Sequence, residues 1–186
     1  MIKDKLAAIT FGMTRKQEAG AIKRFLIYMW EDTYGVFLPR RTIEKITDLW
    51  HTPELISFQM EDPDFFFGVL RDDDGIDIIG LVTVKKSAEG VLSIDRLYVH
   101  PRFQRQGFGK RLLDYSLGMF PCSRKFRGEV FKDNGTALNF YAGQGFAVVG
   151  TKKDKVEDVL LDAIVMEKEL DRRSRFSLTA HNVLGK

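Results

Sequence analysis

The stretch Asp95-Arg96-Leu97-Tyr98-Val99-His100-Pro101-Arg102-Phe103-Gln104-Arg105-Gln106-Gly107-Phe108-Gly109-Lys110 decides the fold of this chain. Its first part predicts a strand that stops at Pro101, and a short basic loop follows. Gly107 and Gly109 then open a helix with leucines on its apolar side. A strand that feeds a helix through a glycine-containing loop presents backbone N–H groups at the positive end of the helix dipole. This arrangement predicts a ligand that carries phosphate or pyrophosphate.

The spacing of the glycines narrows the class of ligand. A dinucleotide-binding loop of the type Gly-x-Gly-x-x-Gly requires a third glycine, and none follows Gly109 at the right distance. A P-loop requires serine or threonine after its lysine, but Arg111 follows Lys110. What remains is Gln104-x-x-Gly107-x-Gly109 after a strand that ends in Val-x-Pro. This pattern resembles the acetyl-CoA loop of the GNAT superfamily of N-acetyltransferases.

A second segment carries the other half of the same resemblance. From Val130 onward the chain fits Val-x-x-x-Asn-x-x-Ala-x-x-x-Tyr, with Asn134, Ala137 and Tyr141 at the named positions, and Gly-Phe follows after a short gap. The two motifs stand in the order that the family shows. The resemblance covers roughly residues 65 to 168.

The apolar periodicity predicts a mixture of helices and strands. Helices are expected over 18–34, from a Thr42 cap to about 50, up to about 60, over 107–119 and over 136–142, and strands over 7–13, 65–70, 76–85, 91–99, 126–131, 146–149 and within 156–170. Asp72 to Gly75 predicts a hairpin turn. This order indicates an α+β or mixed α/β three-layer fold. The resemblance implies a mostly antiparallel twisted sheet, splayed between the strands that carry Val99 and Val130.

The domain prediction is one acetyltransferase-like domain over residues 1–170. It comprises a helical acceptor-binding region at about 15–60 and a cofactor core at about 65–168. Residues 171–186 have lost periodicity and are expected to form a tail.

Composition excludes several classes of protein. The 186 residues are 44% hydrophobic and 30% charged, which is typical of a globular chain. The net charge of +3 is too small to indicate nucleic-acid binding, and no nucleic-acid motif is present. The single Cys122 excludes an internal disulfide and favours a reducing compartment; we expect it buried or half-buried in a loop. The longest apolar run is too short to span a membrane, so a cytoplasmic protein with no membrane partner is predicted.

The resemblance implies transfer of an acetyl group from acetyl-CoA to a primary amine by direct attack in a ternary complex, with no metal. An alkyl ammonium has a pKa near ~10, so a carboxylate must help to remove its proton. The tetrahedral oxyanion needs an N–H donor, which the resemblance places on the backbone of the strand carrying Val99. Tyr141 is the expected general acid toward the leaving thiolate. The alternative interpretation is a tyrosine of the core whose hydroxyl is hydrogen-bonded.

Two carboxylates are candidates for the base. Glu129 and Asp95 both lie on strands that flank the splay, at positions resembling those where family members carry a base. Glu129 is preferred, because the shorter Asp95 needs a bridging water. Each has another interpretation: Glu129 is simply exposed, and Asp95 pairs with Arg96 or Arg127.

The cofactor-binding residues fall into three groups. Backbone amides of the loop are expected to hold the pyrophosphate: Gln104, Arg105, Gln106, Gly107, Phe108, Gly109 and Lys110. Its two glycines are expected to permit close approach because they lack Cβ. Leu97, Tyr98 and Val99 are expected to line the pantetheine arm. The Asn134 side chain is expected to bond to backbone or cofactor amides, to cap the following helix, or to do both.

The acceptor region is expected around Glu31, Asp32 and Tyr34. The stretch from Trp30 to Tyr34 loosely resembles one in polyamine acetyltransferases of the PaiA type, so these acids are candidates to bind a cationic polyamine. Glu31 and Asp32 equally fit the solvent-exposed face of an amphipathic helix. Protein N-termini, lysines, aminoglycosides and amino acids remain alternative acceptors. A catalytically silent acyl-CoA sensor is an alternative of another class, and a homodimer is compatible with the fold by analogy.

Overall fold

The computed structural model describes residues 9–72, 78–156 and 159–170. In these residues one seven-stranded sheet has the order β1-β2-β3-β4-β5-β7-β6. Its strands are β1 Thr10–Met13, β2 Phe65–Arg71, β3 Ile78–Lys86, β4 Val91–Val99, β5 Lys125–Phe131, β6 Ala147–Val156 and β7 Val159–Glu169. Neighbouring strands are antiparallel except β4 and β5, which are parallel. The predicted mixed α/β fold is confirmed.

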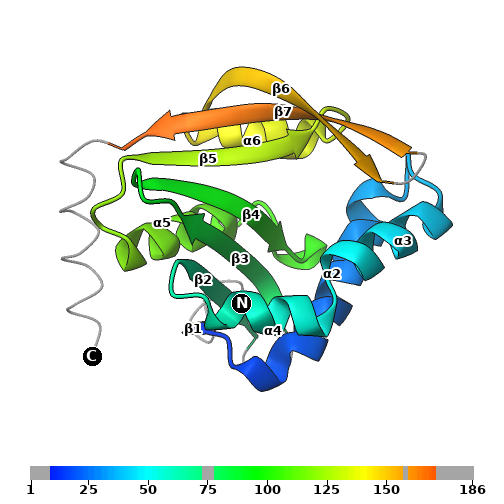
Figure 1. The fold of residues 1–186 in the computed structure, drawn as a ribbon, viewed down its shortest axis with the longest axis horizontal. Helices are drawn as coiled ribbons and strands as arrows, with labels where there is room; N and C mark the ends of the chain where they lie inside the picture. The colour runs from blue at the N-terminus through cyan, green and yellow to red at the C-terminus, as the bar shows by residue number, and fades with distance from the viewer. Residues whose placement is uncertain (1–8, 73–77, 157–158, 171–186) are drawn as a thin grey trace.

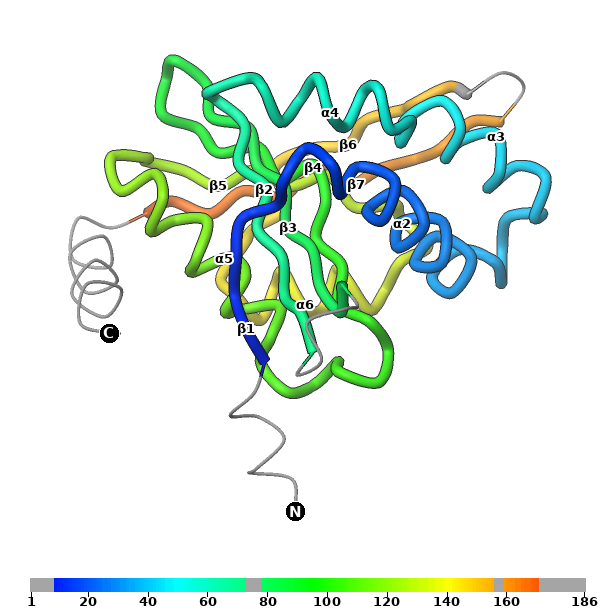
Figure 2. Tube along the Cα trace, turned by 90° about the horizontal axis from the view of Figure 1, so that it is seen from below, coloured from blue at the N-terminus to red at the C-terminus, as the bar shows by residue number. Residues whose placement is uncertain are grey.

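The helices cover both faces of the sheet (Figure 2). They are α2 Ala19–Tyr34, α3 Arg40–Trp50, α4 Pro53–Glu61, α5 Phe108–Met119 and α6 Gly135–Gly143, with short 3-10 turns η2 Lys16–Glu18 and η3 Pro101–Phe103. Alternate residues of a strand point to opposite faces. Val69 and Leu81 therefore pack with α2 and α4, whereas Leu70 and Val82 pack with α5. The three predicted layers follow from this alternation.

Helix starts follow local chemistry, with one correction. Thr52 caps α4 by accepting a 3.0 Å hydrogen bond from the Leu55 N–H, and Pro53 occupies the first turn. The predicted Thr42 cap of α3 is wrong: the helix begins at Arg40 after Pro39, and the Thr42 N–H donates to the Pro39 carbonyl at 2.8 Å. Proline holds the entry dihedral that a side-chain cap would otherwise select.

A β-bulge interrupts the pairing of β4 with β3. Ile94 lies opposite Val84 and Arg96 lies opposite Thr83, so Asp95 is the extra residue. Ile94 and Leu97 both contact the core on the α5 side, whereas Arg96 bonds to Gln59 of α4. A bulge bends its strand and increases the local twist.

Strands β4 and β5 separate beyond this bulge (Figure 1). Their pairing covers only Val91–Ile94 of β4 and Lys125–Gly128 of β5. The predicted splay between the strands that carry Val99 and Val130 is confirmed. Backbone groups of β4 and β5 that face the opening lack a strand partner on that side, and they must bond to something else.

Other expectations have mixed outcomes. The strand expected over 146–149 is longer, because β6 pairs with β7 along its whole length. Cys122 is exposed, so the expectation of a buried or half-buried residue is wrong; it lies in the turn between α5 and β5. Residues 73–75 of the predicted hairpin turn and the predicted tail, 171–186, lie outside the described residues. Within the described part of the chain, no helix has the length and apolarity needed to cross a membrane.

Candidate active site

The loop between β4 and α5 has the backbone shape of an anion site. Gly107 precedes α5 with φ 85°, and Arg105 adopts φ 60°, which is uncommon for a residue with a side chain. The Gln104 side chain donates to the Val99 carbonyl at 2.9 Å and ties the loop to its strand. No side chain caps the first turn of α5. Its amides therefore point into the loop without a protein cap, as pyrophosphate binding requires.

The two glycines of the loop serve different purposes. A Cβ at Gly107 would meet nothing within 4 Å, so this position needs glycine for its left-handed dihedral. A Cβ at Gly109 would lie 3.1 Å from the Phe140 ring of α6. Gly109 therefore allows α5 and α6 to approach each other, and its expected role in the approach of pyrophosphate stays a prediction.

The side chains of the loop are mostly engaged with protein. Lys110 pairs with Asp114 at 2.5 Å, the Gln106 amide donates to the Arg102 carbonyl at 3.0 Å, and Phe108 is buried in the core. The exposed Arg105 has no such contact among the described residues. A ligand would consequently meet backbone amides at most of these positions.

The strand residues expected to line the pantetheine alternate between two faces. Leu97 and Val99 pack against the core under α5, whereas Tyr98 packs with α2 on the other face. The β4 backbone therefore forms one edge of the splay, and the side chains of this segment point to both faces of the sheet.

Helix α6 contributes the second motif. The Asn134 side chain accepts a 3.0 Å hydrogen bond from the Ala137 N–H and caps the helix, which confirms the capping interpretation. Tyr141 is buried beside Gly128 of β5 and against Phe146. Burial raises the pKa of the Tyr141 phenol, so it keeps its proton at neutral pH.

Tyr34 reaches the same place from α2. It is buried between Trp30 and Phe131, and its hydroxyl hydrogen-bonds to Asn134 and Tyr98. Burial raises the pKa of Tyr34 and of Tyr98, so both phenols are neutral. Tyr34 thus connects α2, β4 and the start of α6 at the splay.

The two candidate bases have different surroundings. Asp95 keeps more than a third of its surface open to water, yet the protein around its carboxyl group desolvates it and raises its pKa. The negative charge of Glu129 also raises the pKa of Asp95, whereas the positive charges of Arg96 and Lys85 lower it. Glu129 accepts from Lys152 at 2.8 Å. Within the described residues, Glu129 therefore shares a lysine, whereas Asp95 has no ion pair.

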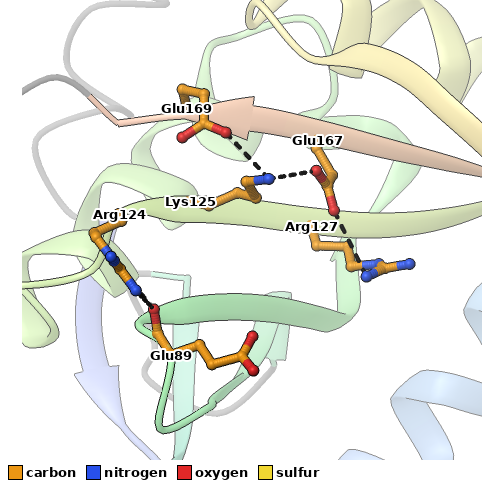
Figure 3. A network of polar contacts seen from close by, with 6 residues as sticks. All are labelled: Glu89, Arg124, Lys125, Arg127, Glu167 and Glu169. Atoms are coloured by element: carbon orange, nitrogen blue, oxygen red, sulfur yellow. Dashed lines mark hydrogen bonds and ion pairs between the residues drawn. The ribbon is translucent and has the colours of Figure 1, made fainter.

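The arginines offered as partners of Asp95 are engaged elsewhere. Arg127 pairs with Glu167 at 3.6 Å, within a network in which Lys125 also bonds Glu167 and Glu169 at 2.7 and 3.1 Å (Figure 3). That network joins β5 to β7 where the strands lie side by side. Arg96 donates hydrogen bonds to the side chains of Gln59 in α4 and Thr83 in β3, and to the carbonyl of Trp50 at the end of α3.

The acids of the acceptor helix lie apart from these carboxylates. Glu31 lies 3.5 Å from Arg40 at the start of α3, and Asp32 is exposed on α2. No contact among the described residues joins either acid to Asp95 or Glu129. Of the predicted acceptor residues, only Tyr34 contacts the residues at the splay.

Two features near the splay were not predicted. Arg96 and His51 are both buried and 3.4 Å apart, and burial lowers the pKa of His51 to about 3, so its ring is neutral. Lys152 reaches Glu129 from β6. A lone arginine in a strand and a lysine in a charged run carry no sequence signal for these contacts.

A cavity of about 450 Å³ lies beside the start of the loop. Arg24 and Tyr28 of α2, His100 and Phe103 line it with the ends of β2 and β3. It touches neither candidate base nor Tyr141. Among the described residues, no cluster of three or more His, Cys, Asp or Glu side chains is arranged to hold a metal ion.

Comparison with known proteins places these features in context. Residues 27–146 match the family model described as "Acetyltransferase (GNAT) family". Among curated proteins there is no match. Similar solved structures include the PaiA N-acetyltransferase of Thermoplasma acidophilum in complex with coenzyme A, which is 21% identical with TM-score 0.73 over 87% of this chain and 99% of that chain.

Two further structures illustrate the range of similar proteins. A GNAT-family acetyltransferase of Staphylococcus aureus Mu50 is 15% identical, with TM-score 0.68 over 88% of this chain and 100% of that chain. The ribosomal-protein-S18-alanine N-acetyltransferase of Escherichia coli is also 15% identical, with TM-score 0.63 over 88% of this chain and 94% of that chain. At these identities the likeness shows a shared fold.

Proposed function

The chain belongs to the GNAT family of acetyltransferases and is an acetyl-CoA-dependent N-acetyltransferase, and we propose that it acetylates a small primary amine with Asp95 as the base and Tyr141 as the acid. The observation that carries this proposal is the bulge, which places Asp95 where β4 and β5 begin to separate. We also infer one acetyltransferase domain over residues 1–170, because the three described core clusters all include residues of a single sheet, and α3 packs on α2 beside it.

The cofactor side supplies binding and orientation. The left-handed residues Arg105 and Gly107 and the uncapped start of α5 suit pyrophosphate. The backbone of β4 beyond Ile94 has no strand partner on the side of β5, and it suits the amide-containing pantetheine arm, which can pair with it as a strand would. A Gly at 109 keeps α5 close to α6 on the same side.

The reaction then needs two proton transfers. The neutral amine attacks the thioester carbonyl, and its proton passes to the Asp95 carboxylate, directly or through a water. A backbone N–H of β4 near Val99 stabilises the oxyanion. When the C–S bond breaks, the thiolate takes a proton from the Tyr141 hydroxyl. The raised pKa of Asp95 suits an acceptor of protons, and the raised pKa of Tyr141 keeps its hydroxyl protonated until the thiolate leaves.

The acceptor is tested by measuring acetyl-CoA-dependent thiol release with a panel of amines: propylamine, 1,3-diaminopropane, spermidine, spermine, an aminoglycoside, free amino acids and short peptides. Turnover with small amines supports the proposal. Turnover with peptides alone moves the assignment to acetylation of protein N-termini or lysines. Silence across the panel together with tight binding of acetyl-CoA overturns the enzymatic assignment in favour of a sensor.

A further inference from the structure

Lys152 extends from β6 across β7 to reach a carboxylate of β5. In the sheet Lys152 lies opposite Ala163, and Ala163 lies opposite Phe131, two residues beyond Glu129. Residues directly opposite each other in antiparallel strands point to the same face. The small side chain of Ala163 leaves room for the lysine stem, whose Nζ ends 2.8 Å from Glu129 and 3.2 Å from Asp154.

This contact divides the carboxylates at the splay into two kinds. Glu129 and Asp154 already share one ammonium group, that of Lys152. The bond to Glu129 raises the pKa of Lys152, so the ammonium keeps its charge at neutral pH. Asp95 has no ion pair among the described residues; Lys85, the cation that influences it besides Arg96, lies 3.8 Å from Asp62. One carboxylate of the splay is therefore available to an incoming cation.

We propose that Lys152 is a specificity-determining residue whose own ammonium occupies the subsite that the second ammonium of a diamine or polyamine would use. The proposal rests on the proposed function, with Asp95 facing the reacting amine. A monoamine needs only Asp95. A diamine brings a second charge, which must either displace Lys152 from Glu129 or lie next to it, and like charges at short range repel. The site thus favours acceptors with a single positive charge near the acetylated end.

The test compares two amines that differ by one ammonium group. The values of kcat/KM for propylamine and 1,3-diaminopropane are measured for the wild type and for Lys152→Ala. Removal of the lysine leaves Glu129 and Asp154 to the second ammonium, so the diamine-to-monoamine ratio should rise about fivefold, as expected for a partly exposed ion pair. Lys153→Ala is the matched control: Lys153 is the next residue along β6, and its nearest acid is Asp162 at 3.9 Å. Its ratio should stay unchanged.

Each other outcome has a defined meaning. An unchanged ratio in Lys152→Ala overturns the proposal, as does an equal loss for both amines, which would make Lys152 a residue that orients Glu129. Lys152→Gln, which keeps the stem that covers Ala163, should give the same rise if the alanine variant loses thermal stability. Failure of the wild type and all three variants to acetylate either amine, with acetyl-CoA still bound, overturns the proposed function itself and this proposal with it.

Discussion

The two sides of the splay between β4 and β5 are built from different parts of the chain. On the cofactor side, the features are backbone conformations within one short segment: φ 60° at Arg105, φ 85° at Gly107 and the uncapped start of α5. On the acceptor side, the features are side chains from separate elements, such as Asp95 on β4 and Lys152 on β6.

This difference explains why the cofactor side is easier to predict from sequence than the acceptor side. A backbone site depends on residues that are neighbours in sequence, so it leaves a short motif. A site of side chains depends on register and packing between distant segments, and it leaves no local pattern. We therefore expect substitutions on the cofactor side to act through backbone shape, and those on the acceptor side to act through charge.

The largest expected effect tests the backbone side. Gly107→Val should weaken acetyl-CoA binding by at least about a hundredfold, because a β-branched residue cannot hold a left-handed dihedral and the amides would turn away from the pyrophosphate. Isothermal titration calorimetry with acetyl-CoA measures the loss. Gly12→Val is the control, since a Cβ there also meets nothing within 4 Å but the residue lies in β1 without a positive φ. Equal affinity in the two variants would refute the placement of the pyrophosphate.

The next effect tests the charged side. Asp95→Asn should lower kcat about a hundredfold at pH 7 because the base is lost. Glu129→Gln should lower it less than about threefold, because Glu129 forms a partly exposed ion pair with Lys152. Steady-state kinetics on both variants decides between the carboxylates, and a larger loss in Glu129→Gln would reverse the assignment.

The pH dependence of the wild type gives an independent check on Asp95. Desolvation raises its pKa above the ordinary 3.8, and the base works only when it is deprotonated. The kcat/KM of the wild type, which reports groups of the free enzyme, should therefore show an acid limb with a midpoint above pH 3.8, and Asp95→Asn should lack this limb. The raised pKa also lowers stability at neutral pH, because the charged Asp95 carboxylate is less favourable in the folded protein than in the unfolded chain. Asp95→Asn should therefore unfold at a slightly higher temperature.

A smaller effect is expected at Tyr141, which lies where the two sides meet. Tyr141→Phe should lower kcat about tenfold, because a thiolate with a pKa near ~8.5 is a fair leaving group even without a proton donor. The KM for the amine should not change, since the phenol acts on the departing sulfur. Near-ultraviolet circular dichroism checks that the ring packing against Phe146 survives. A change in the amine KM alone would place Tyr141 on the acceptor side instead.

The smallest effect concerns Arg105. Arg105→Gly should relieve the left-handed strain and raise the unfolding temperature by about 1–3 °C, while acetyl-CoA affinity changes less than about threefold. Arg102→Gly is the control, because Arg102 lies in η3 without a positive φ, so glycine there should lower stability. Differential scanning calorimetry and titration measure both. A tenfold loss of affinity in Arg105→Gly would show that the guanidinium binds phosphate and would weaken the contrast between the two sides.

The fold could be predicted from sequence to a large extent. The strand over 91–99 and the helix that ends at Met119 match the structure closely, because apolar periodicity, Pro101 and the glycines all act locally. The capping role of Asn134 was also predictable from its place before a helix. The Thr42 cap was not, because Pro39 also starts a helix well and the periodicity does not distinguish them.

The sequence by itself determined the family, the co-substrate and the shape of the cofactor loop, because backbone conformation at Gly107 and the start of α5 depends on adjacent residues. Only the tertiary structure decided which of the two carboxylates forms an ion pair with another described residue. The bulge at Asp95 and the reach of Lys152 over Ala163 to Glu129 arise from register between strands far apart in the chain. Charge pairing acts through space and not along the chain, and for that reason the acceptor side emerges only when the sheet is assembled.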